Sequence, residues 1–413
     1  MTPKLSALGW SALPPTRVFS GVGPDLGRGR DGRAVAPLTA EAFAIVAGAR
    51  SGVHALPRAI SKWFTCVLAV ALTPLLSAAN SAPAKKLGVG LYGSNGHQLT
   101  AAKFANHANA QLVAVAMIRQ TTLPEGVKRY ASLDELIADP TVDLVSLCSP
   151  RRADQARDAI RCLDAGKHVY AEKPAALTEA DLDQILAAAQ RSGKEFHEMA
   201  GTVFTSNYAP MRKLVREGAV GDVIQVLVQK SYKYGQARPH DEAIDGGMFL
   251  QAGIHAARMI EHVGGARIKT ITGWETTFGS PEKGDGKIAG AAQIGLENGG
   301  IATIIINYLN PGIASQPHGN ETLRVFGTKG FIESVDGGAR TRLVTAKGAV
   351  EPLDPVGSGA GDYFDFVAAH LISAIAMPLT LDEELHPLRM LLRAKEELRS
   401  KSKNPAAPEA AHK

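Results

Sequence analysis

The stretch KHVYAEKPAALT, residues 167–178, decides the fold of this protein. Its first half is a short apolar run, which is typical of a buried strand, and the run ends at a proline that cannot extend a strand ladder. Thr178 is a favourable N-cap for the helical pattern LTEADLDQILAAAQRSG that follows, residues 177–193. A buried strand that leads directly into a helix is the repeating unit of a parallel sheet.

The same alternation of strand and helix continues on both sides of this stretch, through residues 87–205. Apolar strands separated by single helices predict an α/β domain with a doubly wound parallel sheet, because antiparallel sheets with one solvated face alternate apolar and polar residues instead. The expected strands are LGVGLY (87–92), QLVAVAMI (111–118), DLVSLCSP (143–150), KHVYAEKP (167–174) and KEFHEMAG (194–201).

The pattern changes in residues 206–400. VIQVLVQKSYKYG, residues 223–235, alternates in the manner of a half-buried strand, and further strand-like runs separated by Gly or Pro turns follow it. Two helical patterns close the segment, and residues 401–413 form a polar tail that we expect to be disordered. The sequence therefore predicts a second, α+β domain with a large, mostly antiparallel sheet.

The charge distribution argues against a nucleic-acid-binding protein. The 413 residues carry a net charge of +5, and 45% hydrophobic with 21% charged residues exclude a disordered, collagen-like or polytopic membrane chain. Residues 1–86 hold ten basic and three acidic side chains, a net charge of +7, which leaves 35 basic and 37 acidic side chains in the remainder. The body of the protein is therefore slightly acidic, and a basic binding surface is not expected.

An uncharged segment, Trp63–Ala84, follows Arg58 and Lys62 and ends in small residues. This order is the layout of a secretory signal peptide, although 22 uncharged residues are also long enough for a single membrane anchor. We expect residues 1–86 to be a leader, made of a disordered extension and a signal peptide or anchor. The protein is then exported and periplasmic, or anchored to the inner membrane.

The position of this apolar segment is unusual, because signal peptides begin close to the N-terminus and this one begins at residue 63. We therefore expect translation to start downstream of Met1, with Val53 as the candidate initiator.

Three motifs carry a resemblance to a known family: AEKPAALT (171–178), GLYGSNGH (90–97) and QAGIH (251–255). On these motifs the chain resembles the glucose–fructose oxidoreductase/inositol dehydrogenase (Gfo/Idh/MocA) family. The resemblance covers roughly residues 86–400. The resemblance implies a Rossmann-type first domain and a nicotinamide-dependent dehydrogenase or reductase that acts on sugars, polyols or similar hydroxylated compounds.

The resemblance also implies three catalytic positions. The lysine of the EKP motif, Lys173, contacts the substrate hydroxyl near the nicotinamide, His255 acts as acid and base, and Gln251 stands where the family has an aspartate that assists the histidine. The chemistry of the reaction agrees with the role of His255. A hydride leaves a carbinol carbon only as the hydroxyl proton is removed, so a positioned base is needed. Lys173 lies at a strand end, where ligands bind in open α/β sheets, and its charge suits a developing alkoxide. The alternative for Lys173 is a solvated lysine at a strand end. The alternative for His255 is a helix histidine whose hydrogen bonds are satisfied within the protein.

The loop opposite the G-x-G-x-x-G fingerprint departs from it, because only its first glycine stays in register. Asn95 replaces the second glycine; it tolerates a left-handed conformation, or Gly96 lets the loop shift by one residue. A phosphate could still meet the amides at the start of the next helix. The candidate cofactor-binding residues are Gly93, Ser94, Asn95, Gly96, His97, Arg119, Ser149, Pro150, Glu172 and Lys173.

Arg119 bears on the choice between NAD and NADP. No acidic residue ends the strand at 111–118, where one would hold the ribose hydroxyls, and Arg119 could pair with a 2′-phosphate instead. This possible pairing slightly favours NADP over NAD. The alternative for Arg119 is a solvated arginine at a strand end. Gln251 in place of an aspartate removes a charge that would raise the basicity of His255.

Three functions stay open at this point. The first is an NAD(P)-dependent oxidoreductase that moves a hydride to or from the hydroxyl carbon of a sugar, polyol or related compound. The others are an exported relative whose permanently bound cofactor serves a redox-neutral, glycosidase-like reaction, and a non-catalytic carbohydrate-binding protein with a decayed nucleotide site. Substrate specificity is expected from second-domain residues such as Tyr208, Tyr232, Tyr234, Arg238 and His240.

The expected partners follow from these functions. They are a small carbohydrate-like substrate and, by family analogy, further copies of the chain bound through the second-domain sheet; no nucleic acid is expected, and a membrane only through an uncleaved leader. The histidines and cysteines lack the short spacings of a metal site, so no metal is expected.

Overall fold

The computed structural model of the chain describes residues 85–204, 207–233, 241–280, 286–310, 320–353 and 362–403. Nearly all of the predicted leader and most of the predicted tail lie outside these residues, so both stay predictions. Within the described residues, no helix is both long enough and apolar enough to cross a bilayer.

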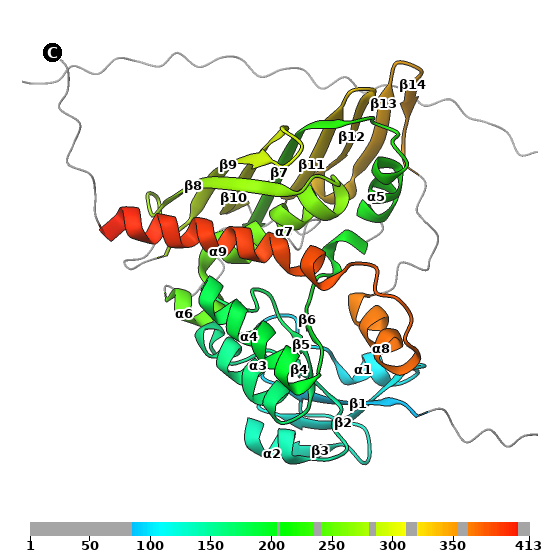
Figure 1. Cartoon of the computed structure of the whole chain (residues 1–413), viewed down its shortest axis with the longest axis vertical. Coiled ribbons are helices and arrows are strands. Elements are labelled where there is room, and N and C mark those ends of the chain that lie inside the picture. Colours follow the sequence, from blue (N-terminus) through cyan, green and yellow to red (C-terminus); the bar gives the residue numbers. More distant parts are fainter. Residues whose placement is uncertain are drawn as a thin grey trace, which may run out of the picture. The chain divides into compact units, whose positions relative to one another are not determined.

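The first sheet has six strands in the order β3-β2-β1-β4-β5-β6, and all its pairs are parallel (Figure 1). The prediction of a doubly wound parallel sheet is confirmed, although the short edge strand β3 was not expected. The strand order reverses between β1 and β4, and ligands bind at such a switch point. The strands are β1 (Leu87–Tyr92), β2 (Ala110–Ala116), β3 (Lys128–Tyr130), β4 (Leu144–Leu147), β5 (His168–Ala171) and β6 (Phe196–Glu198).

The helices of the first domain follow their capping signals. As expected, the Thr178 side chain accepts from the amide of Asp181, 3.1 Å away. Gly193 ends the helix in a left-handed conformation. The helix predicted after the first turn is much shorter than its sequence pattern indicates, since it has only four residues. The helices are α1 (Ala101–Phe104), α2 (Leu133–Ala138), α3 (Gln155–Asp164) and α4 (Glu179–Ser192).

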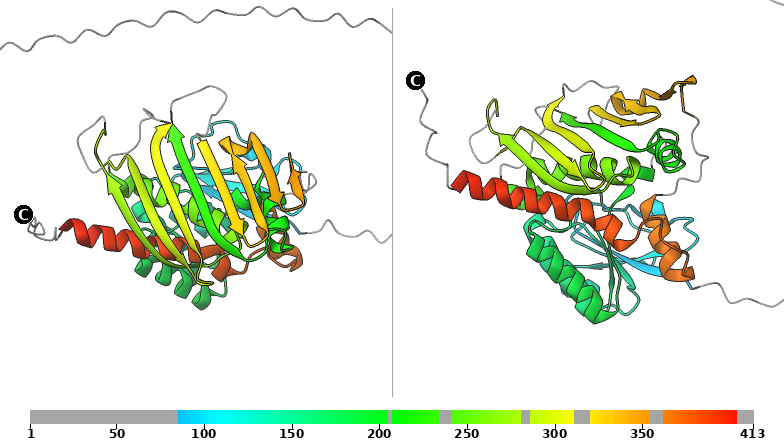
Figure 2. Two further views of the ribbon diagram at one scale, coloured as in Figure 1. Left: turned by 90° about the horizontal axis from the view of Figure 1, so that it is seen from above. Right: turned by 45° about the horizontal axis from the view of Figure 1, so that its top comes forward.

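The second sheet has eight strands in the order β14-β13-β12-β11-β7-β10-β9-β8. It is mostly antiparallel, as predicted, with one parallel pair between β7 and β10. In Figure 2 the described helices α7 and α9 lie on one face of this sheet. The strands are β7 (Val223–Lys233), β8 (Ile268–Thr276), β9 (Ala289–Leu296), β10 (Ile301–Asn310), β11 (Asn320–Gly327), β12 (Gly330–Val335), β13 (Arg340–Thr345) and β14 (Gly348–Val350).

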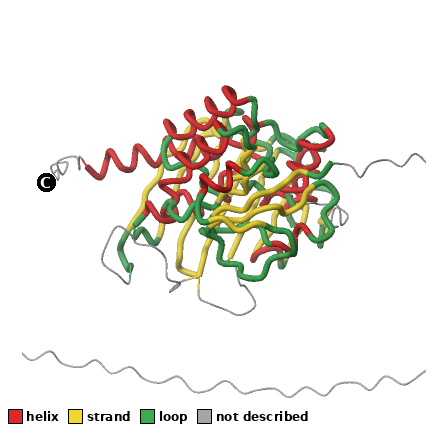
Figure 3. The backbone as a smooth tube through the Cα atoms, turned by 90° about the horizontal axis from the view of Figure 1, so that it is seen from below, coloured by secondary structure: helices red, strands yellow, loops and turns green. Residues whose placement is uncertain are grey.

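The helix α9 joins the two halves, because it contacts β8 and α7 of the second domain and α4 and β6 of the first (Figure 1). Its C-terminal end extends beyond the other helices (Figure 3). The helices of the second half are α5 (Tyr208–Arg216), α6 (Glu242–Asp245), α7 (Gly247–Arg258), α8 (Tyr363–Ser373) and α9 (Leu381–Lys403).

Helix α8 returns to the first sheet although it follows the second sheet in the chain. Phe364 is fully buried, and its ring centre lies 5.5 Å from that of Tyr170 and 5.7 Å from that of Phe104. Val367 is buried in the same core, which also holds Val89 of β1. Burying such side chains contributes about 1.5–3 kcal/mol each, so the C-terminal segment stabilises the first domain directly.

Candidate active site

Lys173 and Gln251 lie together although they belong to different domains. Lys173 follows β5 and is buried, and its Nζ donates to Oε1 of Gln251 at 2.5 Å and to the Gln251 carbonyl oxygen at 3.3 Å. The Gln251 amide nitrogen donates in turn to the carbonyl oxygen of Asp245. Gln251 therefore orients the lysine, and His255 follows it by one turn on the same face of α7.

His255 is a neutral imidazole at physiological pH. Burial lowers its pKa well below the ordinary value of 6.5, and the positive charges of Lys173, Lys230 and Arg258 lower it further. This lowered pKa agrees with the expectation from the sequence. A carboxylate at position 251 would raise the basicity of the ring, and the chain has Gln251 there instead. A neutral ring of this kind can accept a proton at any pH above its lowered pKa.

Aromatic side chains from the second sheet lie beside His255. The ring centre of Tyr232, on β7, lies 6.4 Å from that of His255, edge to face, and 5.9 Å from that of Tyr308 on β10. Tyr232 is one of the expected specificity residues, and the structure places it at the candidate site. Tyr234, Arg238 and His240 lie outside the described residues.

A lysine that was not among the predicted site residues lies in the same place. Lys230 of β7 is buried, lies 4.7 Å from the centre of the Tyr232 ring and forms an ion pair with Glu321 of β11. The Tyr208 hydroxyl donates to the other oxygen of Glu321 at 2.9 Å. The alternation of VIQVLVQKSYKYG was a usable signal, since it places residue 230 on the same strand face as the buried Val226 and Val228.

The loop after β1 depends on two glycines. Gly93 has φ +72°, and a Cβ there would overlap the carbonyl of Cys148. Gly96 has φ +113°, and a Cβ there would lie 2.6 Å from Cγ of Glu172. The left-handed position therefore falls on Gly96, which is the shift by one residue, and Asn95 does not adopt a left-handed conformation.

Asn95 instead ties three segments together through its side chain. Its Nδ2 donates to the carbonyl oxygens of Pro150, at 3.2 Å, and Ile244, at 2.5 Å. Ile244 belongs to α6, so the loop after β1 is attached to the second domain at this point. Pro150 takes part through its backbone, which keeps the segment after β4 close to the loop.

Gln98, in the place of the third fingerprint glycine, explains the short first helix. Its amide nitrogen donates to the carbonyl oxygens of Tyr92 (2.9 Å), Gly93 (3.2 Å) and Ser146 (3.0 Å). These bonds hold the chain extended past the strand ends, and helix α1 begins only at Ala101. The expectation that a phosphate meets the amides at the start of this helix stays a prediction, and a helix of four residues adds little dipole to those amides.

Glu172 and Arg152 support the loop from within the protein. Oε1 of the buried Glu172 lies 3.0 Å from Nδ1 of the exposed His97, and the guanidinium of the buried Arg152 donates to the carbonyl oxygen of Asn95 at 2.8 Å. Burial alone would raise the pKa of Glu172, but the bond to His97 and the charge of Lys173 outweigh it and lower the pKa. His97 is therefore held in a fixed orientation at the surface.

The remaining predicted cofactor residues divide into two groups. Ser149 turns inward, where its hydroxyl donates to Asp158 of α3 at 2.9 Å. Ser94 accepts from the backbone amide of Arg119 at 2.9 Å, and the Arg119 side chain is exposed. Ser94 and Arg119 thus meet where β1 and β2 end. With the two required glycines beside the β1–β4 switch point, this edge fits a dinucleotide.

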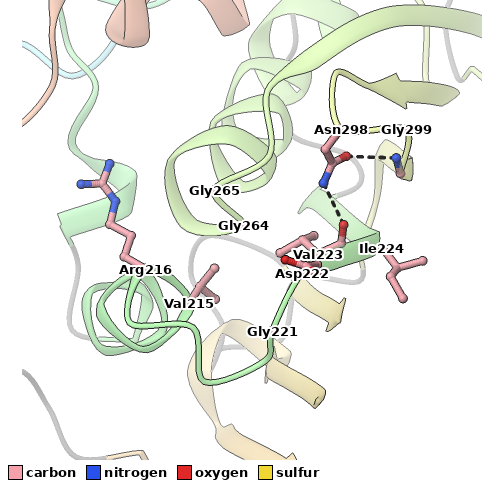
Figure 4. Close-up of a pocket in the computed structure, with 11 residues that line it drawn as sticks. Val215, Arg216, Gly221, Asp222, Val223, Ile224, Gly264, Gly265, Asn298 and Gly299 are labelled. Carbon is pink, nitrogen blue, oxygen red and sulfur yellow. Dashed lines mark hydrogen bonds between the residues drawn. The ribbon is translucent and has the colours of Figure 1, made fainter. Parts of the chain in front are cut away.

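A cavity of about 620 Å³ lies elsewhere in the second domain, at the start of β7. Asn298 lies on one side of it and donates to the carbonyl oxygen of Val223 at 2.9 Å, and the side chain of Arg216 points away from Asp222 (Figure 4). The lining contains five glycines and none of the site residues described above. Among the described residues, no group of three or more acidic, histidine or cysteine side chains could hold a metal ion.

Comparisons with known proteins agree with this arrangement. Residues 87–199 match the model of an oxidoreductase family with an NAD-binding Rossmann fold, and residues 208–333 match that of the Gfo/Idh/MocA C-terminal domain. Curated relatives include myo-inositol 2-dehydrogenase of Thermotoga maritima, 27% identical over 54% of this chain and 67% of the relative. Trans-1,2-dihydrobenzene-1,2-diol dehydrogenase of Bos taurus is 27% identical over 55% of this chain and 66% of the relative.

The chain spans between about half and two thirds of the length of the curated relatives it matches. The matches to solved structures cover a larger share of both chains. The structure of a putative oxidoreductase from Thermotoga maritima has a TM-score of 0.68 at 24% identity, and the match covers 76% of this chain and 98% of the other. Aldose-aldose oxidoreductase from Caulobacter crescentus has a TM-score of 0.65 at 22% identity, with the same two coverages, and both share the fold. The chain belongs to the Gfo/Idh/MocA family of NAD-binding oxidoreductases.

Proposed function

We propose that the protein transfers a hydride between NAD(P) and the hydroxyl-bearing carbon of a sugar, polyol or related compound. The observation that carries this proposal is the 2.5 Å bond from the Lys173 ammonium to Gln251, one turn before His255. It brings a cation from the nucleotide-binding domain and an imidazole from the second domain to one place. Two curated relatives, by name an inositol and a dihydrodiol dehydrogenase, act on compounds of this kind.

The nicotinamide, when bound, supplies the hydride acceptor or donor, and the protein supplies the proton chemistry. The Lys173 ammonium donates to the substrate oxygen and stabilises its negative charge as the hydroxyl proton leaves. The neutral His255 accepts that proton. Gln251 accepts from Lys173 and so points the ammonium, without adding a negative charge that would oppose the alkoxide.

The cofactor is held at the carboxyl ends of β1 and β2, with NADP preferred over NAD. Ser94 lies at the ribose edge, and Arg119 is exposed beside it, where a 2′-phosphate would meet a guanidinium. Arg129 of β3 adds a second cation near Arg119. Its guanidinium donates to the carbonyl oxygen of Gln120, the residue after Arg119, at 2.8 Å. Fluorescence titration with NADPH and NADH tests this preference: wild type binds NADPH more tightly, and Arg119→Ala removes the difference.

The protein forms a homo-oligomer through the outer face of the second sheet. This face, opposite α7 and α9, exposes Trp274, Ile301 and Ile305, at 59%, 52% and 48% of their accessible surface. Large apolar side chains that gather on one face mark an interaction surface. Light scattering coupled to gel filtration tests this, with Ile301→Asp and Ile305→Asp expected to shift the protein to monomer.

The protein is exported to the periplasm by its leader. The support is the order of basic residues, apolar segment and small residues over positions 58–84. Cell fractionation combined with sequencing of the mature N-terminus tests both the destination and the cleavage.

One experiment tests the central proposal. The purified protein is examined for a bound dinucleotide by absorbance, titrated with NADH and NADPH, and assayed with myo-inositol, glucose and a cyclic diol. We expect dinucleotide binding and turnover, with Lys173→Ala and His255→Ala abolishing turnover while cofactor affinity changes little. Absence of any dinucleotide binding would reject an NAD(P)-dependent reaction, and full activity in both variants would reject the site.

A further inference from the structure

The face of the second sheet that packs against α7 carries a buried ion pair. Lys230 of β7 and Glu321 of β11 are directly opposite each other across the two strands, and the ammonium contacts Oε1 of the carboxylate. Lys230 is 4% exposed, while the Glu321 side chain is 17% exposed. The Tyr208 hydroxyl donates to Oε2 at 2.9 Å, so both carboxylate oxygens are held in place.

This pair lies beside the reaction centre. The Lys230 ammonium is 4.7 Å from the centre of the Tyr232 ring, and that ring is 6.4 Å from His255. Burial lowers the pKa of Lys230 to about 7, and the positive charge of Lys173 contributes to this lowering. The carboxylate of Glu321 contacts the ammonium, and an opposite charge at this distance favours the charged form of the lysine. The charges of Lys173 and Lys230 both act on His255 as well. The two lysines and the imidazole therefore share one electrostatic environment.

Packing alone does not explain a lysine at this position. Val226 and Val228 precede it on the same face of β7 and are buried in the core. A buried ion pair is often no more stabilising than apolar side chains of similar volume, because both ions lose their hydration. An apolar residue would continue the pattern of β7 at lower cost. The pair therefore requires a reason other than stability.

We propose that Lys230 and Glu321 are the substrate-recognition pair of this active site, and that they bind the hydroxyl group adjacent to the reacting carbon of a vicinal diol. A hydroxyl is at once a donor and an acceptor. The Lys230 ammonium donates to its oxygen, and Glu321, the more exposed partner, accepts its hydrogen. Tyr232 covers the apolar side of the ring or chain that carries the diol. The inference rests on the proposed oxidoreductase function.

The test compares two substrates that differ by one hydroxyl, cis-1,2-cyclohexanediol and cyclohexanol, using the full-length protein with NAD and NADP. For Lys230→Met and Glu321→Gln we expect kcat/KM for the diol to fall roughly 10- to 100-fold, because a charged hydrogen-bond partner of the substrate is lost. For cyclohexanol, which lacks the second hydroxyl, we expect a smaller loss, so that the ratio of the diol kcat/KM to the cyclohexanol kcat/KM falls in both variants. Lys230→Arg, which keeps the charge, should recover part of the diol activity.

Lys167→Met is the matched control for loss of a buried lysine. Lys167 is also buried, but it donates to the carbonyl oxygens of Asp139 (2.9 Å) and Val142 (2.8 Å) in the first domain. This variant should keep the wild-type ratio of diol to cyclohexanol activity, even where its melting temperature falls. Circular dichroism establishes that each variant is folded, and the near-isosteric Glu321→Gln tests the pair if Lys230→Met does not fold.

The outcomes separate this inference from the proposed function. Turnover by wild type with an unchanged activity ratio in Lys230→Met and Glu321→Gln overturns the recognition pair and leaves the oxidoreductase intact. If neither wild type nor the variants turn over either substrate, calorimetric titration with the diol decides whether the pair binds it. Diol binding that both variants lose supports the pair and rejects the reaction, and no binding by wild type rejects both.

Discussion

Gly96 lies directly against Glu172, so that a Cβ added to the glycine would stand 2.6 Å from Cγ of the glutamate. The carboxylate is buried at this point and holds His97 of the same loop. The loop after β1 and the EKP segment after β5 are therefore shaped against each other. We therefore expect a change in either one to reach the proposed nucleotide site beside Lys173.

Gly96→Ala should weaken cofactor binding more than it weakens the fold. The new methyl group must displace Glu172 and adopt φ +113°, a conformation that L residues rarely take. We expect dinucleotide affinity to fall at least tenfold and the free energy of unfolding to fall by roughly 1–3 kcal/mol. Fluorescence titration and urea denaturation measure the two effects. Gly126→Ala, at φ +83° with open space around it, is the control for backbone strain alone, and equal affinity loss in both variants would contradict the role of Glu172.

Gln251→Asp should move the acid limb of the pH–rate profile to higher pH. In wild type burial and nearby cations hold the pKa of His255 well below 6.5, so the ring remains a base in mildly acidic solution. A carboxylate four residues earlier on α7 favours the protonated ring and raises this pKa, so activity is lost at a higher pH as the pH falls. The profile of kcat/KM between pH 4 and pH 8 measures the shift. Gln251→Asn, which adds no charge, controls for altered geometry; an identical acid limb in Gln251→Asp and wild type would speak against His255 as the base.

The buried histidine of β6 should make stability depend on pH in the alkaline range. Burial alone would lower the pKa of His197, but Glu384, 2.9 Å from Nδ1, and Glu195 outweigh burial and raise it to about 9. A raised folded-state pKa stabilises the protein below the unfolded value of 6.5, and this contribution is lost as the pH rises through about 9. The contribution of His197 to the free energy of unfolding should therefore fall by up to about 3 kcal/mol between pH 6.5 and pH 9.5.

Urea denaturation at several pH values checks this dependence, which His197→Gln should abolish. His262 offers a matched control, because it is also buried but its pKa is lowered to about 3. It remains neutral throughout the alkaline range, so His262→Gln should leave the slope unchanged. A slope that persists in His197→Gln would assign the effect to another group.

Removing the carboxylate that faces Arg258 should destabilise the protein strongly. Glu198 and Arg258 form an ion pair with both side chains fully buried, and Glu198 also accepts from the amide of Ala175 at 2.7 Å. Glu198→Gln leaves the guanidinium buried without its counter-charge, which costs about 3–5 kcal/mol. The double variant Glu198→Gln/Arg258→Met should recover part of this loss. Denaturation curves of the three proteins test it, and an unaltered midpoint in Glu198→Gln would show that Arg258 finds other compensation.

Local sequence patterns predicted the elements well where the signal was local. The Thr178 cap and the apolar run of β1 both appear in the structure as expected. The first helix failed for a non-local reason, because Gln98 bonds to the carbonyl of Ser146, 48 residues away, in place of continuing a helix. The same limit hid Lys230, because its partner Glu321 lies on β11, 91 residues further along the chain.

The sequence by itself determined the fold class and the family, because strand and helix periods and a short motif are written in neighbouring residues. It also named Lys173, Gln251 and His255 as the candidate catalytic residues, which stay a prediction. Only the tertiary structure decided what these residues meet. Lys173 reaches Gln251 across 78 residues, and Lys230 reaches Glu321 across 91. Such pairs depend on how α7 and the strands of the second sheet pack against the nucleotide-binding domain. That packing is set by burial of side chains from the whole chain, and no local window of sequence contains it.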